Sequence, residues 1–458
     1  MTSEVVVVMV PFVAQGHLNQ LLHLSRLISA YNIPIHFVCT ATHNRQARKR
    51  LHGWSPNNVI HFHDLPDPDF TSPPPDPNAT THFPKHLQPL FNSSLKLRGP
   101  VFDLITSISQ TYKRVVVVHD ALMSYVVQDV KTIPNAETYV FRGLSVFYYF
   151  YTTWEKLGRK LPFEQGIIVK NLPTLGESMS REFFEFVQLQ YSHLTSYVGC
   201  LYDSSRVIEK MFLESLEKDE IYGRKHWGLG PLNPLEIQSD ILDSGKRHMC
   251  MQWLDKHPAS SVIYVSFGTT TTFTDDQIVE LAIGLERSEQ RFLWVLRDAD
   301  KGDTSRKEDG RRVMLPKGFE ERVEGRGLVV RDWVPQLEIL GHLSTGGFVS
   351  HCGWNSCMEA MTTGVAVAAW PIHSDQPYNA LLLSHVLGVA LVMREWARRG
   401  ELLTSEVIEN IVRKLMDSKE GEVIKKRAAE FGDELRRSMA DDGVTRKELS
   451  SFISYISR

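Results

Sequence analysis

The fold is decided by the stretch Gly346-Gly-Phe-Val-Ser-His351-Cys-Gly-Trp-Asn355-Ser356-Cys-Met-Glu359. Phe348 to Ser350 is a short apolar run typical of a buried strand, Gly353 permits a tight turn, and residues 355–362 have helical character. This order predicts a strand, a turn and the N-terminus of a helix. Free backbone N–H groups and the positive end of the helix dipole make such a terminus a binding site for phosphate.

The side chains around this turn have the chemistry of a nucleotide site. His351, Asn355 and Ser356 can donate hydrogen bonds to a diphosphate. Glu359 lies one helical turn after Asn355, so its carboxylate can accept hydrogen bonds from ribose hydroxyls on the same face. Upstream, Trp333 can stack on a base. Each residue alone also suits an ordinary role as core, helix cap or solvated surface, so only their combination points to a ligand.

A second polar group follows the apolar run Val365 to Ala369. Trp370-Pro371 ends that predicted strand, and Asp375 and Gln376 fall in the loop after it. Their polar atoms suit sugar hydroxyls. The loop is expected at the carboxyl ends of the strands, where α/β folds bind ligands.

Outward from this region, both halves of the chain alternate short β-rich runs with amphipathic stretches. The runs Val5 to Val10 and Val115 to Val118 are almost wholly apolar, and the same rhythm restarts at Val262. Such runs suit strands buried on both faces of a parallel sheet. We therefore predict an α/β protein built from two doubly wound parallel-sheet domains.

The domain boundary is predicted from turn-forming residues. Gly and Pro residues between 228 and 234, followed by a polar stretch, mark a linker. We therefore assign residues 1–240 to a domain that holds the acceptor and the catalytic base. Residues 241–458 form a nucleotide-binding domain, whose last helix can pack back on the first domain. The proline-rich stretch 64–89 is predicted to be a surface loop.

Composition excludes several classes of protein. With 42% hydrophobic and 23% charged residues the chain is an ordinary globular protein, and its formal charge of −3 offers no field for nucleic acid or anionic lipid. No apolar run approaches the roughly 20 residues that span a bilayer, and no signal peptide is evident. The five cysteines are scattered without metal-ligand spacing. We expect a cytoplasmic monomer with no metal site and no nucleic-acid partner.

Residues 333–376 resemble, nearly end to end, the signature box of plant secondary-product UDP-glycosyltransferases of glycosyltransferase family 1. The resemblance implies a GT-B architecture, in which two Rossmann-like domains face a cleft, with a UDP-sugar as co-substrate and no metal or other cofactor. The donor-binding residues that it implies are Trp333 at the base, Gln336 and Glu359 at the ribose, His351, Asn355 and Ser356 at the diphosphate, Trp354, Asp375 and Gln376 at the sugar, Ser266 and Thr269 in a second phosphate turn, and Val334 and Gly353 elsewhere in the same box.

Transfer to a hydroxyl needs a positioned base, and His17 is the candidate. It follows the first predicted strand, after Gly16, and begins an amphipathic helix whose N-terminus should keep the imidazole neutral. Asp120, directly after another predicted strand, is the best carboxylate to orient His17 and stabilise its protonated form. The family carries a similar His and Asp. The neighbouring His119 is the chief competitor for the role of base.

The acceptor is the least defined part of the reaction. Stretches such as Ala14 to Arg26 look like the zeatin O-glycosyltransferase branch of the family, which implies an inverting transfer of glucose to a zeatin-type cytokinin. A flavonoid or another phenolic is the alternative acceptor, and xylose remains an alternative to glucose. The aromatic residues Phe147, Tyr148 and Tyr151 suit either a core helix or the wall of an acceptor pocket.

Two functions from other classes are alternatives. A non-catalytic sensor of UDP-sugar or hormone would show a lost base or a broken phosphate site, and both sites look intact. A nicotinamide-dependent oxidoreductase would need Gly-x-Gly-x-x-Gly after the first strand. That strand leads instead to Ala14-Gln-Gly-His17.

Overall fold

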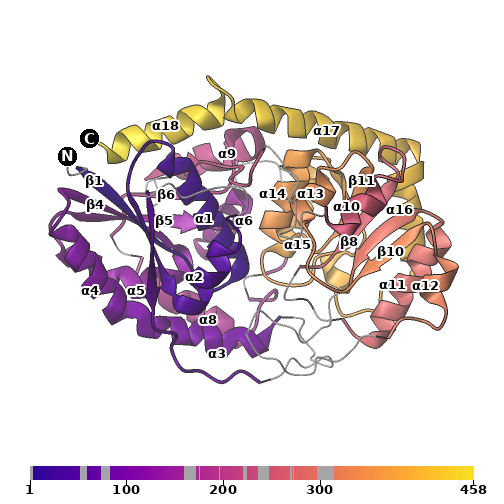
Figure 1. Ribbon diagram of the computed structural model, residues 1–458, viewed down its shortest axis with the longest axis horizontal. Helices are drawn as coiled ribbons and strands as arrows, with labels where there is room; N and C mark the ends of the chain where they lie inside the picture. The colour runs from indigo at the N-terminus through magenta and orange to yellow at the C-terminus, as the bar shows by residue number, and fades with distance from the viewer. Residues whose placement is uncertain are drawn as a thin grey trace.

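The computed structural model describes residues 4–51, 59–73, 83–158, 172–174, 176–194, 196–219, 224–235, 247–268, 271, 273–296 and 314–458. These residues form two parallel sheets, each covered by helices (Figure 1). The boundary predicted near residue 240 and the middle of the proline-rich stretch, residues 74–82, lie outside the described residues.

The first sheet has seven strands in the order β3-β2-β1-β4-β5-β6-β7, and every neighbouring pair is parallel. All six residues of β1 are at most 8% exposed, as expected for a strand covered on both faces. The prediction of a doubly wound α/β fold is confirmed. The strands are β1 (Val5–Val10), β2 (Ile35–Thr40), β3 (Ile60–Leu65), β4 (Arg114–Asp120), β5 (Ala136–Arg142), β6 (Gly199–Tyr202) and β7 (Lys225–Gly228).

Helices and short turns connect these strands. The helices are α1 (Gln15–Ser29), α2 (Ala41–Arg48), α3 (Gln88–Ser93), α4 (Arg98–Ser109), α5 (Ser124–Val127), α6 (Val146–Lys156), α8 (Arg181–Ser192) and α9 (Arg206–Glu217). The 3₁₀ turns are η1 (Lys85–Leu87), η2 (Ser94–Leu97), η3 (Ala121–Met123) and η4 (Gln128–Thr132).

The second sheet has six parallel strands in the order β10-β9-β8-β11-β12-β13. They are β8 (Val262–Ser266), β9 (Arg291–Val295), β10 (Gly327–Val330), β11 (Thr345–Ser350), β12 (Val367–Ala369) and β13 (Ala390–Val392). The accompanying helices are α10 (Met249–Leu254), α11 (Asp275–Ser288), α12 (Phe319–Arg322), α13 (Gln336–Leu340), α14 (Trp354–Thr363), α15 (Gln376–Leu381), the π turn η5 (Leu382–Val386), η6 (Trp396–Arg398), α16 (Ser405–Asp417), α17 (Lys419–Met439) and α18 (Val444–Ile456).

Each sheet has a point where the strand order reverses, and both points carry predicted site residues. In the first sheet β1 lies beside β4, so the loop to His17 starts next to Asp120. In the second sheet β8 lies beside β11, and Ser266 pairs with Ser350, the residue before His351. Ligands bind at such switch points because the loops on either side separate and leave a crevice.

The C-terminal helices join the two halves. Figure 1 shows α17 and α18 running along one side of the molecule, from the second sheet back towards the N-terminus. On α18, Leu449 and Phe452 are fully buried in the core of the first sheet, where the Phe452 ring packs edge-on against Trp227 at 5.4 Å. The last helix, α18, therefore packs on the core of the first sheet.

Candidate active site

His17 and Asp120 meet at the switch point of the first sheet. His17 Nδ1 lies 2.7 Å from Asp120 Oδ2, and Asp120 is only 1% exposed. The other carboxylate oxygen, Oδ1, accepts a hydrogen bond from the Leu122 N–H at 2.8 Å, so the carboxylate is held from both sides. His17 lines the cleft between the two sheets. With Nδ1 occupied by Asp120, Nε2 is the nitrogen left for a substrate.

The surroundings of His17 shift its pKa in the opposite direction to the helix N-terminus considered alone. Its place at a helix N-terminus predicted a neutral imidazole. Burial does act to lower the pKa of His17, but the charge and hydrogen bond of Asp120, together with the charge of Asp375, outweigh it and raise the pKa above 6.5. The carboxylates stabilise imidazolium more than burial opposes it. A proton taken up by His17 is thereby stabilised.

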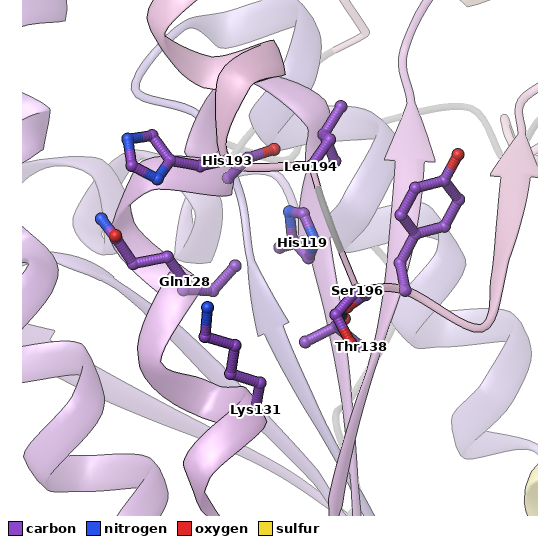
Figure 2. Close-up of a pocket in the computed structure, with 10 residues that line it drawn as sticks. His119, Gln128, Lys131, Thr138, His193, Leu194 and Ser196 are labelled. Carbon is purple, nitrogen blue, oxygen red and sulfur yellow. Dashed lines mark hydrogen bonds between the residues drawn. The ribbon is translucent and has the colours of Figure 1, made fainter.

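His119, the competing base, faces a different space. Its Nδ1 donates to the backbone carbonyl of Asp120 at 2.9 Å, and burial lowers the pKa of His119 to about 4. Figure 2 shows its ring among Gln128, Lys131 and His193, in a small polar hollow. His119 does not line the cleft that His17 lines.

Gly143 leaves space for the His17–Asp120 pair, and no sequence pattern identified it. A Cβ at this position would lie 3.3 Å from His17 Nδ1 and would collide with Gln20 Oε1. A larger residue would therefore displace the α1 side chains that surround His17. Only the close approach of β5 and α1 reveals this constraint.

The cleft draws its walls from both halves of the chain. Residues of α1 and its preceding loop form one wall, and α13, α14 and their loops form the other. At the centre Asn355 Nδ2 donates to the Gly16 carbonyl at 2.9 Å, so the predicted phosphate turn abuts the residue before His17. The predicted donor-binding residues that line the cleft are Ser266, Trp333, Val334, Gln336, His351, Gly353, Trp354, Asn355, Ser356, Glu359 and Asp375. Thr269 lies outside the described residues.

The phosphate turn is built as the sequence predicted. Helix α14 begins after Gly353, which makes no side-chain cap, so the first N–H groups stay available for an anion. The His351 ring lies against both Gly268 and Gly353, where any Cβ would collide with it. Burial lowers the pKa of His351 to about 4, so the ring is a neutral donor. The indole N–H of Trp354 donates to the Asp203 carbonyl at 2.7 Å and ties α14 to the first domain.

A hydrogen-bonded group marks the predicted ribose site. Gln336 Nε2 donates to Glu359 Oε2 at 2.6 Å and to Ser356 Oγ at 3.0 Å. Burial raises the pKa of Glu359 to about 7. Next to this group Trp333 keeps 53% of its surface exposed, which is unusual for a tryptophan and leaves a ring face for a base.

Of the three residues predicted at the sugar, Trp354 and Asp375 line the cleft and Gln376 does not. Burial raises the pKa of Asp375 to about 6 against the opposing effects of Asn379 and His17. Gln376 is buried, and its Oε1 accepts from the N–H groups of Ile372 and His373 at 2.8 and 2.9 Å. Its side-chain oxygen therefore shapes the loop and does not line the cleft.

The aromatic residues suggested for an acceptor pocket lie elsewhere. Phe147 is fully buried against Phe212, while Tyr148 and Tyr151 pack against Tyr378, and none of the three lines the cleft. The reason is tertiary: buried Glu209 accepts from the Val146 and Phe147 N–H groups and anchors the first turn of α6, whose aromatic side chains pack on Phe212 and Tyr378.

Other phenylalanines line the cleft beside His17. They come from segments far apart in the sequence, which is why no pattern revealed them. The Phe12 ring lies 5.4 Å from the His17 ring and 5.1 Å from Phe91, and Phe83 lies 4.8 Å from Phe183. This apolar wall suits a flat or hydrophobic ligand.

Two further features of the described residues concern metal binding and membrane spanning. No group of three or more His, Cys, Asp or Glu side chains among them is arranged to hold a metal ion. Nor is any of the described helices long and apolar enough to cross a bilayer.

Comparison with known proteins matches both halves of the chain. A family model described as glycosyltransferase, N-terminal domain, matches residues 3–234, and one described as UDP-glucoronosyl and UDP-glucosyl transferase matches residues 227–426. A zeatin O-glucosyltransferase of Phaseolus lunatus is 51% identical over 100% of this chain and 98% of that protein. A zeatin O-xylosyltransferase of Phaseolus vulgaris is 50% identical over 100% and 99%. The crystal structure of a UGT transferase from Siraitia grosvenorii in complex with UDP is 26% identical, with a TM-score of 0.79 over 99% of this chain and 100% of that one.

Proposed function

Because the chain belongs to the family of UDP-glucoronosyl and UDP-glucosyl transferases, we propose that it moves glucose from UDP-glucose to a hydroxyl of a zeatin-type cytokinin. The protein is a UDP-glycosyltransferase with the GT-B fold, so the resemblance identified in its sequence is confirmed. The two relatives that act on zeatin match the whole chain and support the acceptor. We further propose that it acts as a monomer, since one chain supplies residues to both walls of the cleft, and that it acts in the cytoplasm.

One observation carries the proposed mechanism: the base and the phosphate turn open onto the same cleft and touch through Asn355 and Gly16. In the proposed step His17 Nε2 accepts the proton of the acceptor hydroxyl. The hydroxyl oxygen then forms a bond to the anomeric carbon, and the bond from that carbon to the phosphate oxygen breaks with inversion. UDP leaves with the electron pair, stabilised by the N-terminus of α14.

The remaining roles follow the chemistry of each part of the donor. Trp333 is proposed to stack on uracil, with Val334 beside it, and Gln336 and Glu359 to hold the ribose. Asp375 is proposed to accept a hydrogen bond from the sugar. His351, Gly353, Asn355 and Ser356 are proposed to bind the phosphate groups. Ser266, Thr269 and Trp354 are the other donor-binding residues proposed.

A panel of UDP-glucose, UDP-xylose and UDP-galactose against zeatin isomers and flavonoids tests the function, with products identified by mass and linkage. We expect the fastest transfer with UDP-glucose and a zeatin. The apolar wall at Phe12, Phe83, Phe91 and Phe183 also suits a flat phenolic, so transfer to a flavonoid alone would replace the cytokinin. Binding of UDP-sugar without any transfer would instead support a sensor.

The rate should fall as the pH is lowered, because protonated His17 cannot accept a proton. Its pKa is raised above 6.5, so kcat/KM for the acceptor should decline as pH falls through that raised value. Asp120→Asn removes the charge that raises the pKa and should move the decline to lower pH, with activity reduced roughly 10²- to 10⁴-fold.

Asp129→Asn is the matched control for this pH profile. Asp129 also holds a cation, Arg98, at 2.7 Å, but it does not line the cleft. Asp129→Asn should leave the decline of kcat/KM at low pH unchanged. If the decline in Asp120→Asn occurs at the same pH as in the unaltered protein, a group other than His17 titrates.

Trp333→Ala should weaken UDP binding without altering the chemistry. Loss of base stacking costs about 1–3 kcal/mol, or roughly 5- to 150-fold in Kd. Calorimetric titration with UDP measures this directly. Leu343→Ala, at a residue that is 84% exposed and outside the cleft, is the control. Equal affinity of Trp333→Ala and the control would remove Trp333 from the base site.

A further inference from the structure

The loop that carries Asp375 is held largely by the other domain. We call residues 372–376 the sugar loop. The Ser374 N–H donates to the Ser178 carbonyl at 2.6 Å, and the His373 ring lies edge-on to Phe83 at 5.6 Å. Just beyond the loop, the Tyr378 hydroxyl donates to the Pro173 carbonyl at 2.9 Å. The first domain therefore determines where this loop of the second domain lies.

Asn379 is the most deeply placed of these contacts. It is fully buried, and its Oδ1 accepts from the Ser145 hydroxyl of the first domain at 2.8 Å. Its Nδ2 donates to Asp375 Oδ2 at 2.6 Å and to the Cys352 carbonyl at 3.0 Å. An amide nitrogen has two hydrogens, so both are used. No rotation of the amide keeps all three bonds.

The three partners of Asn379 belong to three parts of the site. Asp375 faces the cleft with one oxygen held by Asn379, which leaves the other oxygen for a hydroxyl group. Cys352 lies in the phosphate turn with φ of +63°, a conformation that few residues with side chains adopt. Ser145 also caps α6, accepting from the Tyr148 N–H at 3.2 Å. One side chain thus links the sugar loop, the phosphate turn and the opposite domain.

We propose that Asn379 is a positioning residue for the donor sugar, and that through Ser145 it makes recognition of the sugar depend on contact between the domains. The ligand is the pyranose of a UDP-sugar, whose hydroxyl donates to the Asp375 oxygen that Asn379 leaves unused. This inference rests on the proposed donor. It adds a residue in the first domain, Ser145, to those that determine which sugar is bound.

Asn379→Asp is the test, because it keeps the shape of the side chain and removes both donated hydrogen bonds. It also places a carboxyl group against Asp375. We expect Kd for UDP-glucose to rise at least about 10-fold while Kd for UDP alone stays within about 3-fold. Two adjacent carboxyl groups share a proton, and the protonated group can donate again. The increase in Kd for UDP-glucose should therefore be smaller at about pH 6 than at about pH 8.

Asn135→Asp is the matched control. Asn135 Nδ2 also donates two hydrogen bonds, to the Ser109 and Tyr112 carbonyls at 2.9 Å each, but it does not line the cleft. It should lower thermal stability without changing the ratio of the two dissociation constants. Ser145→Ala, which leaves both bonds donated by Asn379, should raise Kd for UDP-glucose about 3-fold and leave UDP binding unchanged.

The binding ratio separates this inference from the proposed function. Titration needs no acceptor, so an unexpected acceptor does not affect it. Equal losses for UDP and UDP-glucose in Asn379→Asp, or no loss for either, would show that Asn379 only stabilises the fold and would overturn the inference. If the unaltered protein bound neither ligand, the proposed donor itself would be wrong.

Discussion

His17→Ala will lower kcat by about 10²- to 10⁴-fold and will leave Kd for UDP within about 3-fold. The imidazole is the only candidate base that both lines the cleft and is held by a buried carboxylate, among the described residues. UDP is expected on the other wall, so its binding does not require the ring. Steady-state kinetics with the best acceptor, together with calorimetric titration of UDP, measures both quantities.

His119→Gln is the informative control for this experiment. His119 precedes Asp120 and is the other candidate base in the sequence. Its ring lies in the separate hollow that Figure 2 shows. Its replacement should leave kcat within a few-fold of the unaltered protein. Full activity in His17→Ala, or an equal loss in His119→Gln, would remove His17 from the role of base.

Phe452→Ala will destabilise the protein by about 3–5 kcal/mol, although residue 452 lies close to the end of the chain. The ring is fully buried between Tyr139 and Trp227 of the first domain, at 5.5 and 5.4 Å. Its removal leaves a cavity that the surrounding strands cannot fill without moving. Denaturant unfolding followed by tryptophan fluorescence measures the loss, because Trp227 reports on this region.

Ser451→Ala controls for any effect on the helix itself. Ser451 precedes Phe452 on α18 and is exposed, so its replacement should change stability by less than about 0.5 kcal/mol. If Phe452→Ala were equally mild, α18 would contribute little to the first domain. A large loss would show that the C-terminus of the chain is required to complete the N-terminal core.

The decline in rate at low pH and the proposed recognition of the sugar both depend on Asp375. Asp375 contributes to the raised pKa of His17, and Asn379 contributes to holding Asp375 in place. A change at Asn379 should therefore alter both donor binding and the pH dependence of transfer. In the proposed mechanism, Asp375 therefore couples the base to donor binding.

The elements of the fold were predictable where local pattern and burial agree. The run Val5 to Val10 was predicted as a strand with the bounds that β1 has, because a strand covered on both faces needs uniformly apolar residues. The phosphate turn was equally predictable, since a strand, a glycine and the start of a helix follow one another within a few residues. The dyad partners His17 and Asp120 each follow a strand, and parallel strands bring such positions to one edge.

Side-chain direction was not predictable, because it depends on distant partners. The aromatic residues of α6 have the same spacing whether they face a ligand or the core, and they pack against Phe212 and Tyr378, both more than fifty residues away. Likewise Gln376 turns inward to bind its own loop. The charge of His17 depends on Asp120 and Asp375, which only folding brings near it.

The sequence by itself thus determined the two parallel-sheet domains, the phosphate turn and the residues from which a donor site can be built. Periodicity and turn chemistry act over a few residues, and they can be read along the chain. Tertiary structure alone decided which aromatic side chains line the cleft and how Asn379 joins the sugar loop to the opposite domain. It also decided which of the two candidate bases, His17 and His119, faces the cleft. Those outcomes depend on burial and electrostatics between segments up to hundreds of residues apart, which no local pattern encodes.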